Sequence, residues 1–177
     1  MRTIRKGIFE TNSSSTHTLV ISNEDTLAKK DFLYFDFDEF GWEFEEYNTP
    51  EERASYLWTY FVYMYSDYDS STHTYDYSKA LEWKDKLENI LNNNGIKCEF
   101  ADPYIKDTGY IDHGNELNGF FESMIENDND KLINYLFGSD SAIYTGNDNC
   151  EKYECDTFDY KINKAEQKGY EVYYKGN

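Results

Sequence analysis

The sequence predicts an α+β domain in which a mixed sheet of about five or six short strands packs with four or five helices. Segments with helical spacing of apolar residues alternate irregularly with short aromatic strand patterns, an order that does not indicate a doubly wound sheet. Tyr, Phe and Trp make up 19% of the chain, whereas disordered segments are poor in aromatic residues. The length of 177 residues suits a single domain over residues 1–177.

The N-terminal part of the chain has the pattern of short strands. Residues 3–9 and 17–22 flank a polar loop, which indicates a hairpin or a strand, loop and strand. Residues 31–38 alternate aromatic and acidic side chains, which predicts a strand with one buried face. The aromatic stretch 40–44 either pairs with this strand or forms a loop.

The clearest local signal is a helix start at residue 49. Thr49 suits the N-cap, Pro50 the first helical position, and Glu52 completes a capping box, so a helix is predicted from there to about Tyr65. Residues 66–78 are rich in turn-forming residues and are interpreted as a polar linker.

The rest of the chain alternates helical and strand patterns. A helix from Ser78 to Asn94 ends at Gly95, which suits a helix C-terminus. The further elements expected are a strand at 96–101, a helix at 117–125 that contains Gly119, a helix at 132–137, a strand at 141–145, a helix from 158 to Gly169 and a strand at 170–174.

Charge excludes several classes of function. Only 17 Lys and Arg stand against 35 Asp and Glu, a formal charge of −18, so the chain would be repelled by nucleic-acid phosphates and by anionic membranes. No apolar run is long enough to span a membrane. We therefore expect no direct nucleic-acid contact and no membrane contact. The N-terminus lacks the apolar run of a signal peptide, and the expected location is the cytoplasm.

Cysteines and histidines give no strong metal motif. The chain has three cysteines, an odd count that favours reduced thiols, and Cys150 and Cys155 lack two further ligands at zinc-site spacing. His73 and His113 lie near carboxylates that are able to hold a divalent cation, but acidic loops of this kind are expected by chance in so acidic a chain. The sequence predicts no metal and no cofactor.

Residues 5–18, RKGIFETNSSSTHT, are the most distinctive segment. They resemble the opening of a group of small tailed-bacteriophage proteins, which reads basic, Gly, x, Phe, Glu, Thr, Asn, Ser, Ser, Ser, x, His. The resemblance covers about the first 20 residues and implies a phage or prophage origin, and hence the cytoplasm of a host cell. The group has no established activity, so it supplies no catalytic residue.

The same segment has two readings from its chemistry. In one, His17 acts as a general base toward a nearby serine and Glu10 orients it, which makes an active site. In the other, Asn and Ser side chains stabilise turns, and His17 is hydrogen-bonded at a strand start. The candidate catalytic residues under the first reading are Glu10, Asn12, Ser13, Ser15 and His17.

Dense acidic residues interleaved with Tyr and Trp are the second candidate site. A basic groove that binds phosphates would also attract such a surface, and the charge would speed the encounter of the two proteins. The alternative is an acidic surface that only keeps the protein in solution. The candidate partner-binding residues are Asp36, Asp38, Glu39, Glu43, Glu45, Glu46, Asp67, Asp69 and Asp76.

These observations lead to two functional hypotheses. The first is a phage-type acidic binding protein that occupies a basic groove on a host protein that handles nucleic acid, and so inhibits or redirects it, as an anti-defence or anti-CRISPR protein would. The alternative is a small enzyme that acts on a nucleotide, a phosphoester or a protein side chain through the Glu10–His17 loop, with or without a metal. A weaker third hypothesis is a virion or assembly component. The sequence leaves the oligomeric state open.

Overall fold

The computed structural model describes residues 15–23, 27–28, 30–41, 44–147 and 152–175, and over these the chain forms five α-helices and ten strands. The predicted α+β class is confirmed. The expected single mixed sheet is instead divided into a four-stranded antiparallel sheet and three two-stranded sheets. Several of these strands are only two or three residues long, which is why periodicity alone did not reveal them.

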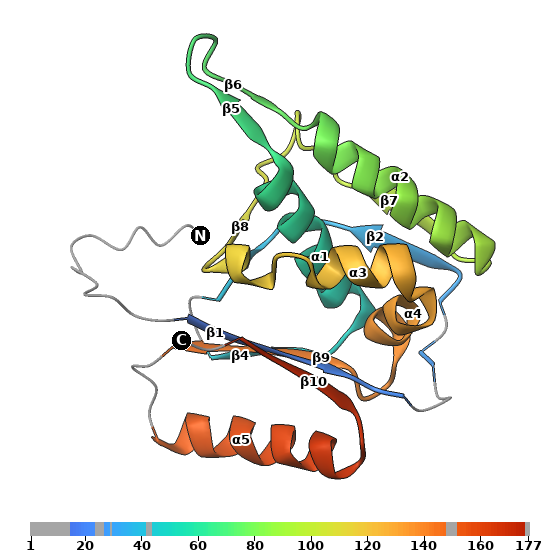
Figure 1. Cartoon of the computed structure of the whole chain (residues 1–177), viewed down its shortest axis with the longest axis vertical. Coiled ribbons are helices and arrows are strands. Elements are labelled where there is room, and N and C mark those ends of the chain that lie inside the picture. Colours follow the sequence, from blue (N-terminus) through green and yellow to red (C-terminus); the bar gives the residue numbers. More distant parts are fainter. Residues whose placement is uncertain (1–14, 24–26, 29, 42–43, 148–151, 176–177) are drawn as a thin grey trace.

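The four-stranded sheet is built around β1. Its order is β10 (Glu171–Lys175), β1 (Ser15–Ile21), β9 (Ala142–Asn147) and β4 (Glu45–Tyr47). Every residue of β1 except Thr16 is buried, because layers cover both faces of the sheet (Figure 1). Successive side chains of a strand point to opposite faces, so Leu19 joins the main core and Val20 joins a second cluster beneath α5.

Helix α5 (Lys152–Gln167) covers the outer face of this sheet (Figure 1). The apolar contact between them is small and contains aromatic and aliphatic side chains from both layers. Its buried members are Val20, Ala142, Tyr144, Ile162, Ala165 and Tyr170.

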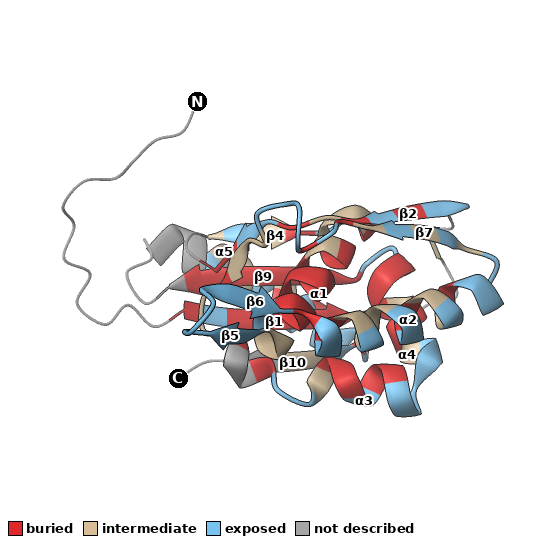
Figure 2. Ribbon diagram, turned by 90° about the horizontal axis from the view of Figure 1, so that it is seen from above, coloured by how far each residue is buried: buried red, intermediate tan, exposed pale blue. Residues whose placement is uncertain are grey.

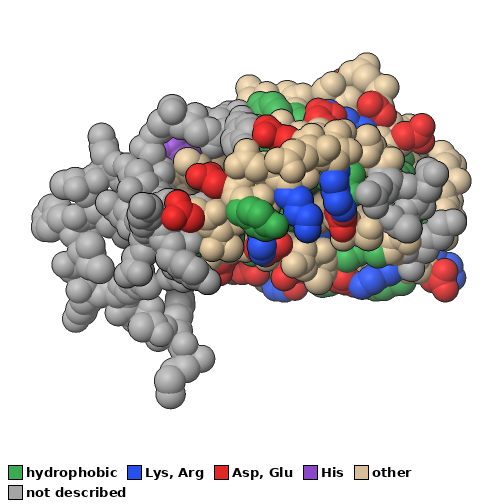
Figure 3. All heavy atoms as spheres, turned by 90° about the horizontal axis from the view of Figure 1, so that it is seen from below, with side chains coloured by type: hydrophobic (Ala, Val, Ile, Leu, Met, Phe, Trp, Pro, Cys, Tyr) green, Lys and Arg blue, Asp and Glu red, His purple; other side chains and the backbone are tan. Residues whose placement is uncertain are grey.

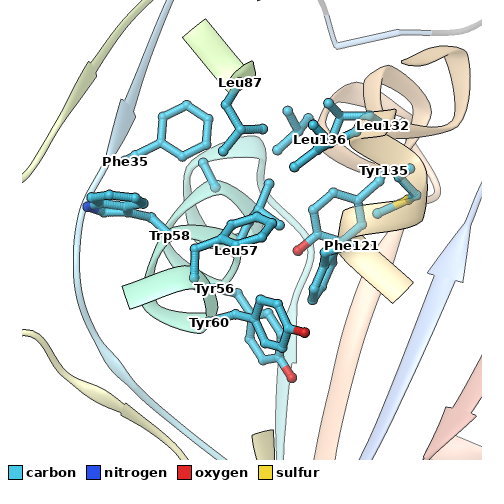
Figure 4. Packing of buried hydrophobic residues seen from close by; sticks show 14 of the residues in the cluster. Phe35, Tyr56, Leu57, Trp58, Tyr60, Leu87, Phe121, Leu132, Tyr135 and Leu136 are labelled. Carbon is cyan, nitrogen blue, oxygen red and sulfur yellow. The ribbon is translucent and has the colours of Figure 1, made fainter. Parts of the chain in front are cut away.

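Helix α1 (Pro50–Tyr65) lies against the inner face and forms the centre of the main core. Its predicted start is confirmed: Thr49 Oγ1 accepts from the backbone N–H of Glu52 at 3.3 Å, and the Glu52 carboxylate accepts from the N–H of Thr49 at 2.9 Å. The helix buries residues on all sides, as Figure 4 shows for Tyr56, Leu57 and Trp58. Such all-round burial is typical of a central helix rather than a surface one.

One buried cation joins α1 to the rest of the fold. Arg53 is 1% exposed, and its guanidinium nitrogens donate to the carbonyls of Asn48 at 2.7 Å, Leu136 at 2.9 Å and Gly138 at 3.2 Å, and to that of Ser141. Burial lowers the pKa of Arg53, but an arginine still stays protonated in proteins. Its charge is therefore balanced by carbonyl dipoles at the C-terminal end of the helix Asn129–Phe137 and just before β9.

A second layer packs along α1. Helix α2 (Ser78–Asn93) ends before Gly95, whose φ of +76° confirms the predicted stop. Strand β2 (Phe32–Phe35) pairs in parallel with β7 (Lys97–Phe100), and β3 (Glu39–Phe40) pairs in parallel with β8 (Tyr110–Ile111). Strand β2 has one buried face, as predicted, but it is shorter than the predicted strand at 31–38. It buries Leu33 and Phe35, whereas the aromatic Phe32 and Tyr34 are exposed.

Helices α3 (Phe120–Asn127) and α4 (Asn129–Phe137) complete the core. The spacing predicted that Gly119 lies within a helix, and this prediction is wrong. Gly119 stands at the N-cap of α3 with φ +83°, after a 3₁₀ turn at Gly114–Leu117, because its left-handed backbone conformation turns the chain between the two elements.

The segment 66–78 is not a plain linker. Its strands β5 (Asp67–Asp69) and β6 (Thr74–Asp76) form an antiparallel hairpin at the end of the molecule opposite α5 (Figure 1). Every residue from 67 to 76 is exposed, and Figure 2 shows both strands in pale blue.

A membrane-crossing helix would need more length and more apolar residues than any helix in the described part of the chain possesses.

Candidate functional site

His17 lies in a buried polar network and is 0% exposed. Its Nε2 is 2.7 Å from the carbonyl oxygen of Asp112, and its Nδ1 is 2.9 Å from the hydroxyl of Tyr56. A carbonyl oxygen only accepts, so Nε2 carries a hydrogen; in the neutral imidazole of that tautomer the Tyr56 hydroxyl donates to Nδ1. Burial raises the pKa of Tyr56 well above its ordinary value, which keeps that donor protonated. Both ring nitrogens of His17 therefore have a partner inside the protein.

Ser15 belongs to the same network but does not contact His17 in the manner of a nucleophile. Its Oγ donates toward the carbonyl of Gly41 at 3.1 Å and the carboxylate of Asp112. Gly41 has φ +100°, and a Cβ there would lie 2.9 Å from the ring carbon Cε1 of His17. Glycine is thus required at this position, both for the backbone conformation and for the close approach of the imidazole.

This geometry favours the structural reading of the segment. Ser15 and His17 hold the loop at 41 and the loop at 112 against β1, and each of their polar atoms named above has a partner inside the protein. The other candidate catalytic residues, Glu10, Asn12 and Ser13, lie outside the described residues.

The β5–β6 hairpin gathers three of the candidate partner-binding residues. Asp67 pairs opposite Asp76, Asp69 pairs opposite Thr74, and Tyr68 pairs opposite Tyr75. Because strand residues alternate between faces, one face of the hairpin carries the three aspartates and the other carries the two tyrosines. Like charges directly opposite one another destabilise a strand pair. The ammonium of Lys79 lies 2.7 Å from Asp67 and partly offsets this repulsion.

Hydrogen bonds favour the charged form of two hairpin aspartates, Asp69 and Asp76. Hydrogen bonds from the side chain and backbone of Ser71 lower the pKa of Asp69, and the same groups of Ser78 lower the pKa of Asp76. The Ser71 bonds to Asp69 measure 2.6 Å and 2.8 Å, and the Ser78 bonds to Asp76 measure 2.5 Å and 2.9 Å. A carboxylate has about four acceptor sites, so each retains acceptor capacity toward a partner.

A ladder of tyrosine rings connects the hairpin to the loop before β8. Ring centroids are 5.0 Å apart for Tyr68 and Tyr75, 5.9 Å for Tyr75 and Tyr77, and 5.0 Å for Tyr77 and Tyr104. The exposed fractions are 53% for Tyr68, 51% for Tyr75 and 59% for Tyr104. We call the tyrosine ladder (Tyr68, Tyr75, Tyr77 and Tyr104) together with Asp67, Asp69 and Asp76 the hairpin surface.

The remaining acidic candidates do not all join this surface. Asp36 forms an ion pair with Lys106, which is two residues along the chain from Tyr104. Asp38 and Glu39 are exposed, and Glu39 belongs to β3. Glu45 accepts from the hydroxyl of Tyr47 at the sheet edge, and Glu46 pairs with Lys161 of α5 on the outer face. Glu43 lies outside the described residues. The acidic side chains therefore form a local surface at the hairpin rather than one continuous patch.

Sequence reasoning missed the paired tyrosines. The signal was the repeated pattern of Asp-Tyr-Asp at 67–69 and Thr-Tyr-Asp at 74–76 around a short turn, which is a hairpin pattern of period two. Serines and threonines outnumber the strand formers there, and this composition outweighed the alternation in the prediction.

The described residues around His73 and His113 form no metal site. His73 lies in the hairpin turn, where its Nδ1 is 3.0 Å from the hydroxyl of Tyr68, and His113 follows Asp112. Across the described residues, no group of three or more His, Cys, Asp or Glu side chains is placed to hold a metal ion.

Compared with known proteins, the chain matches no protein-family model, no curated protein and no solved structure. Functional reasoning therefore depends on the chemistry of its own surfaces.

Proposed function

We propose that this is an acidic binding protein that inserts its hairpin surface into a basic groove of another protein and thereby inhibits or redirects that protein. The observation that carries the proposal is the exposed tyrosine pair. Tyr68 and Tyr75 are each about half exposed on a hairpin that extends from the body, with three aspartates on its other face. Tyr is enriched at protein interfaces, where it supplies large contact area with few rotatable bonds.

The chemistry of the hairpin surface resembles that of single-stranded nucleic acid. Grooves that bind single strands combine basic side chains, which track phosphates, with aromatic side chains, on which bases stack. The hairpin surface presents carboxylates in place of phosphates, and the exposed rings of Tyr68, Tyr75 and Tyr104 in place of bases. This correspondence supports a target that handles nucleic acid, and the resemblance of residues 5–17 to tailed-phage proteins supports a target in the host cell.

The test compares binding of wild-type protein, two hairpin variants and a matched control. One hairpin variant replaces Asp67, Asp69 and Asp76 with Asn, and the other replaces Tyr68 and Tyr75 with Ser. The control replaces three exposed acidic residues away from the hairpin, Asp85, Asp130 and Glu166, with their amides, so that its net charge equals that of the first hairpin variant. Each protein is used to capture partners from a bacterial lysate. The captured protein is then purified, and its binding of a labelled single-stranded oligonucleotide is measured with and without the wild-type chain.

We expect the wild-type and control proteins to capture the same basic partner and to displace the oligonucleotide from it. Both hairpin variants should lose at least about tenfold in affinity. The wild-type affinity should fall as salt rises from about 0.05 to 0.3 M, because exposed charges are screened over these concentrations. A captured partner that keeps its oligonucleotide, or that binds the charge control as weakly as the hairpin variants, would contradict the proposal.

A further inference from the structure

A concave site lies at the opposite end of the molecule from the hairpin. It is a pocket of about 390 Å³ between the outer face of the four-stranded sheet and α5. This volume falls near the lower end of the range for small-molecule sites. Val20, Ala142 and Ala165 contribute a small apolar lining, and charged and hydroxyl groups make up most of the remainder.

Three lysines of α5 line this pocket. Lys161, Lys164 and Lys168 recur at spacings of three and four residues, which places them on the same face of the helix. Figure 3 views the molecule from the α5 side, and blue Lys and Arg side chains stand together near the middle of this face. The chain has only 17 basic residues and a formal charge of −18, so three lysines in one small hollow are a strong local departure from its composition.

Two of the lysines are held by an acid and a tyrosine each. Lys161 pairs with Glu46, which also accepts from the hydroxyl of Tyr144 at 3.3 Å. Lys168 pairs with Asp140 at 2.5 Å, and Asp140 also accepts from the hydroxyl of Tyr170 at 2.8 Å. The two units have the same composition and lie on either side of Lys164 along the helix.

Lys164 is the uncompensated charge. Among the described residues its ammonium forms no ion pair and no hydrogen bond. The pKa of Asp140 is lowered mainly by hydrogen bonds from Lys168 and Tyr170, and the charge of Lys164 adds a smaller contribution. The three lysines exceed the two carboxylates, so the pocket lining carries a net charge of +1. An ammonium group has three N–H donors, and most of those of Lys164 remain available to a ligand.

We propose that this pocket binds a phosphorylated sugar, free or as part of a mononucleotide, with the phosphate on Lys164. A phosphate offers strong acceptor oxygens to the lysines, and Glu46 and Asp140 accept hydrogen bonds from sugar hydroxyls. The polar lining argues against a purely apolar ligand. This site is independent of the hairpin surface, and either proposal can fail without the other.

The test is calorimetric titration of the full chain with ribose 5-phosphate, adenosine 5′-monophosphate, inorganic phosphate and unphosphorylated ribose. We expect both organic phosphates to bind more tightly than ribose. Lys164→Gln should weaken them about tenfold or more, whereas Lys97→Gln, at an exposed lysine of β7, should not. Because both lysines are exposed, neither change should alter the melting temperature.

A gain of binding provides a second test that misfolding cannot imitate. Asp140→Asn removes one competing carboxylate and raises the net charge of the pocket, so inorganic phosphate should bind more tightly. Asp85→Asn makes the same change of charge on α2 and should have no effect. Absence of phosphate binding at millimolar concentration, equal binding by Lys164→Gln, or equal gains in the two aspartate variants would each overturn the proposal.

Discussion

Alkaline pH should unfold this protein through its buried tyrosines. Burial raises the pKa of each of these phenols far above the ordinary value near 10, with hydrogen bonds to carboxylates adding to the effect at some of them. Five tyrosines that are 9% exposed or less have a pKa raised in this way, namely Tyr47, Tyr56, Tyr60, Tyr135 and Tyr144. In the folded state they stay neutral at pH 11, whereas in the unfolded chain they ionise.

The magnitude follows from proton linkage. A phenol that titrates near pH 10 only in the unfolded state destabilises the fold by about 0.4 kcal/mol at pH 10 and about 1.4 kcal/mol at pH 11. For the five tyrosines together the loss is about 2 kcal/mol at pH 10 and about 7 kcal/mol at pH 11. A domain typically has about 5 to 15 kcal/mol of stability. Stability should therefore be intact below about pH 9 and lost as pH rises through roughly 10.5 to 12.

The assay follows tyrosinate absorbance and far-ultraviolet circular dichroism during the same titration. The buried group should ionise only together with loss of the dichroism, and not before it. Between pH 10 and pH 11, Tyr56→Phe should reduce the loss of unfolding free energy by about 1 kcal/mol, because this variant lacks one of the five phenols. Ionisation of all 18 tyrosines in one phase near pH 10, with the dichroism intact, would refute the reasoning.

Three further predictions concern single positions. Gly41→Ala should lower the free energy of unfolding in urea by about 2 to 3 kcal/mol, because its Cβ would lie 2.9 Å from the His17 ring on a left-handed backbone. Gly95→Ala, with φ +76° and open space around it, should lower it by about half as much, and equal losses would exclude the close contact as the cause. Arg53→Met should cost about 3 to 5 kcal/mol by the same measurement, since four carbonyls lose a donor and three of these bonds are buried. A loss below about 1 kcal/mol would contradict the structure. Cys98 should react with iodoacetamide much more slowly at pH 8 in the folded protein than in urea, because burial raises the pKa of its thiol to about 11. Peptide mapping would measure the two reaction rates, and equal rates would disprove the prediction.

The sequence predicted the elements whose signals are local. Thr49, Pro50 and Glu52 are close neighbours, and together they define the start of α1 because a capping box involves only adjacent turns. Gly95 marks the end of α2 for an equally local reason. The strand predicted at 31–38 is confirmed only for Phe32–Phe35, where residues alternate between exposed and buried.

The missed features depend on residues far apart in the chain. The partners of His17 are Tyr56 and Asp112, 39 and 95 positions away, so no spacing rule places them together. Strand β4 has three residues and is defined only by its pairing with β9. Glu46 is likewise separated from the hairpin aspartates by the fold. It contacts α5 on the outer face of the four-stranded sheet, whereas the hairpin lies at the opposite end of the molecule.

The tyrosine-rich composition separates into two populations with different physical roles. Buried tyrosines such as Tyr56, Tyr60 and Tyr135 are explained by folding, because their rings fill the core and their hydroxyls satisfy polar groups within it. Tyr68 and Tyr75 are not explained in this way, since each keeps about half of its surface in solvent on a hairpin that contributes no residue to the core. Replacing the exposed pair should therefore change the free energy of unfolding little, and a loss of partner binding in that variant measures the interface rather than the fold.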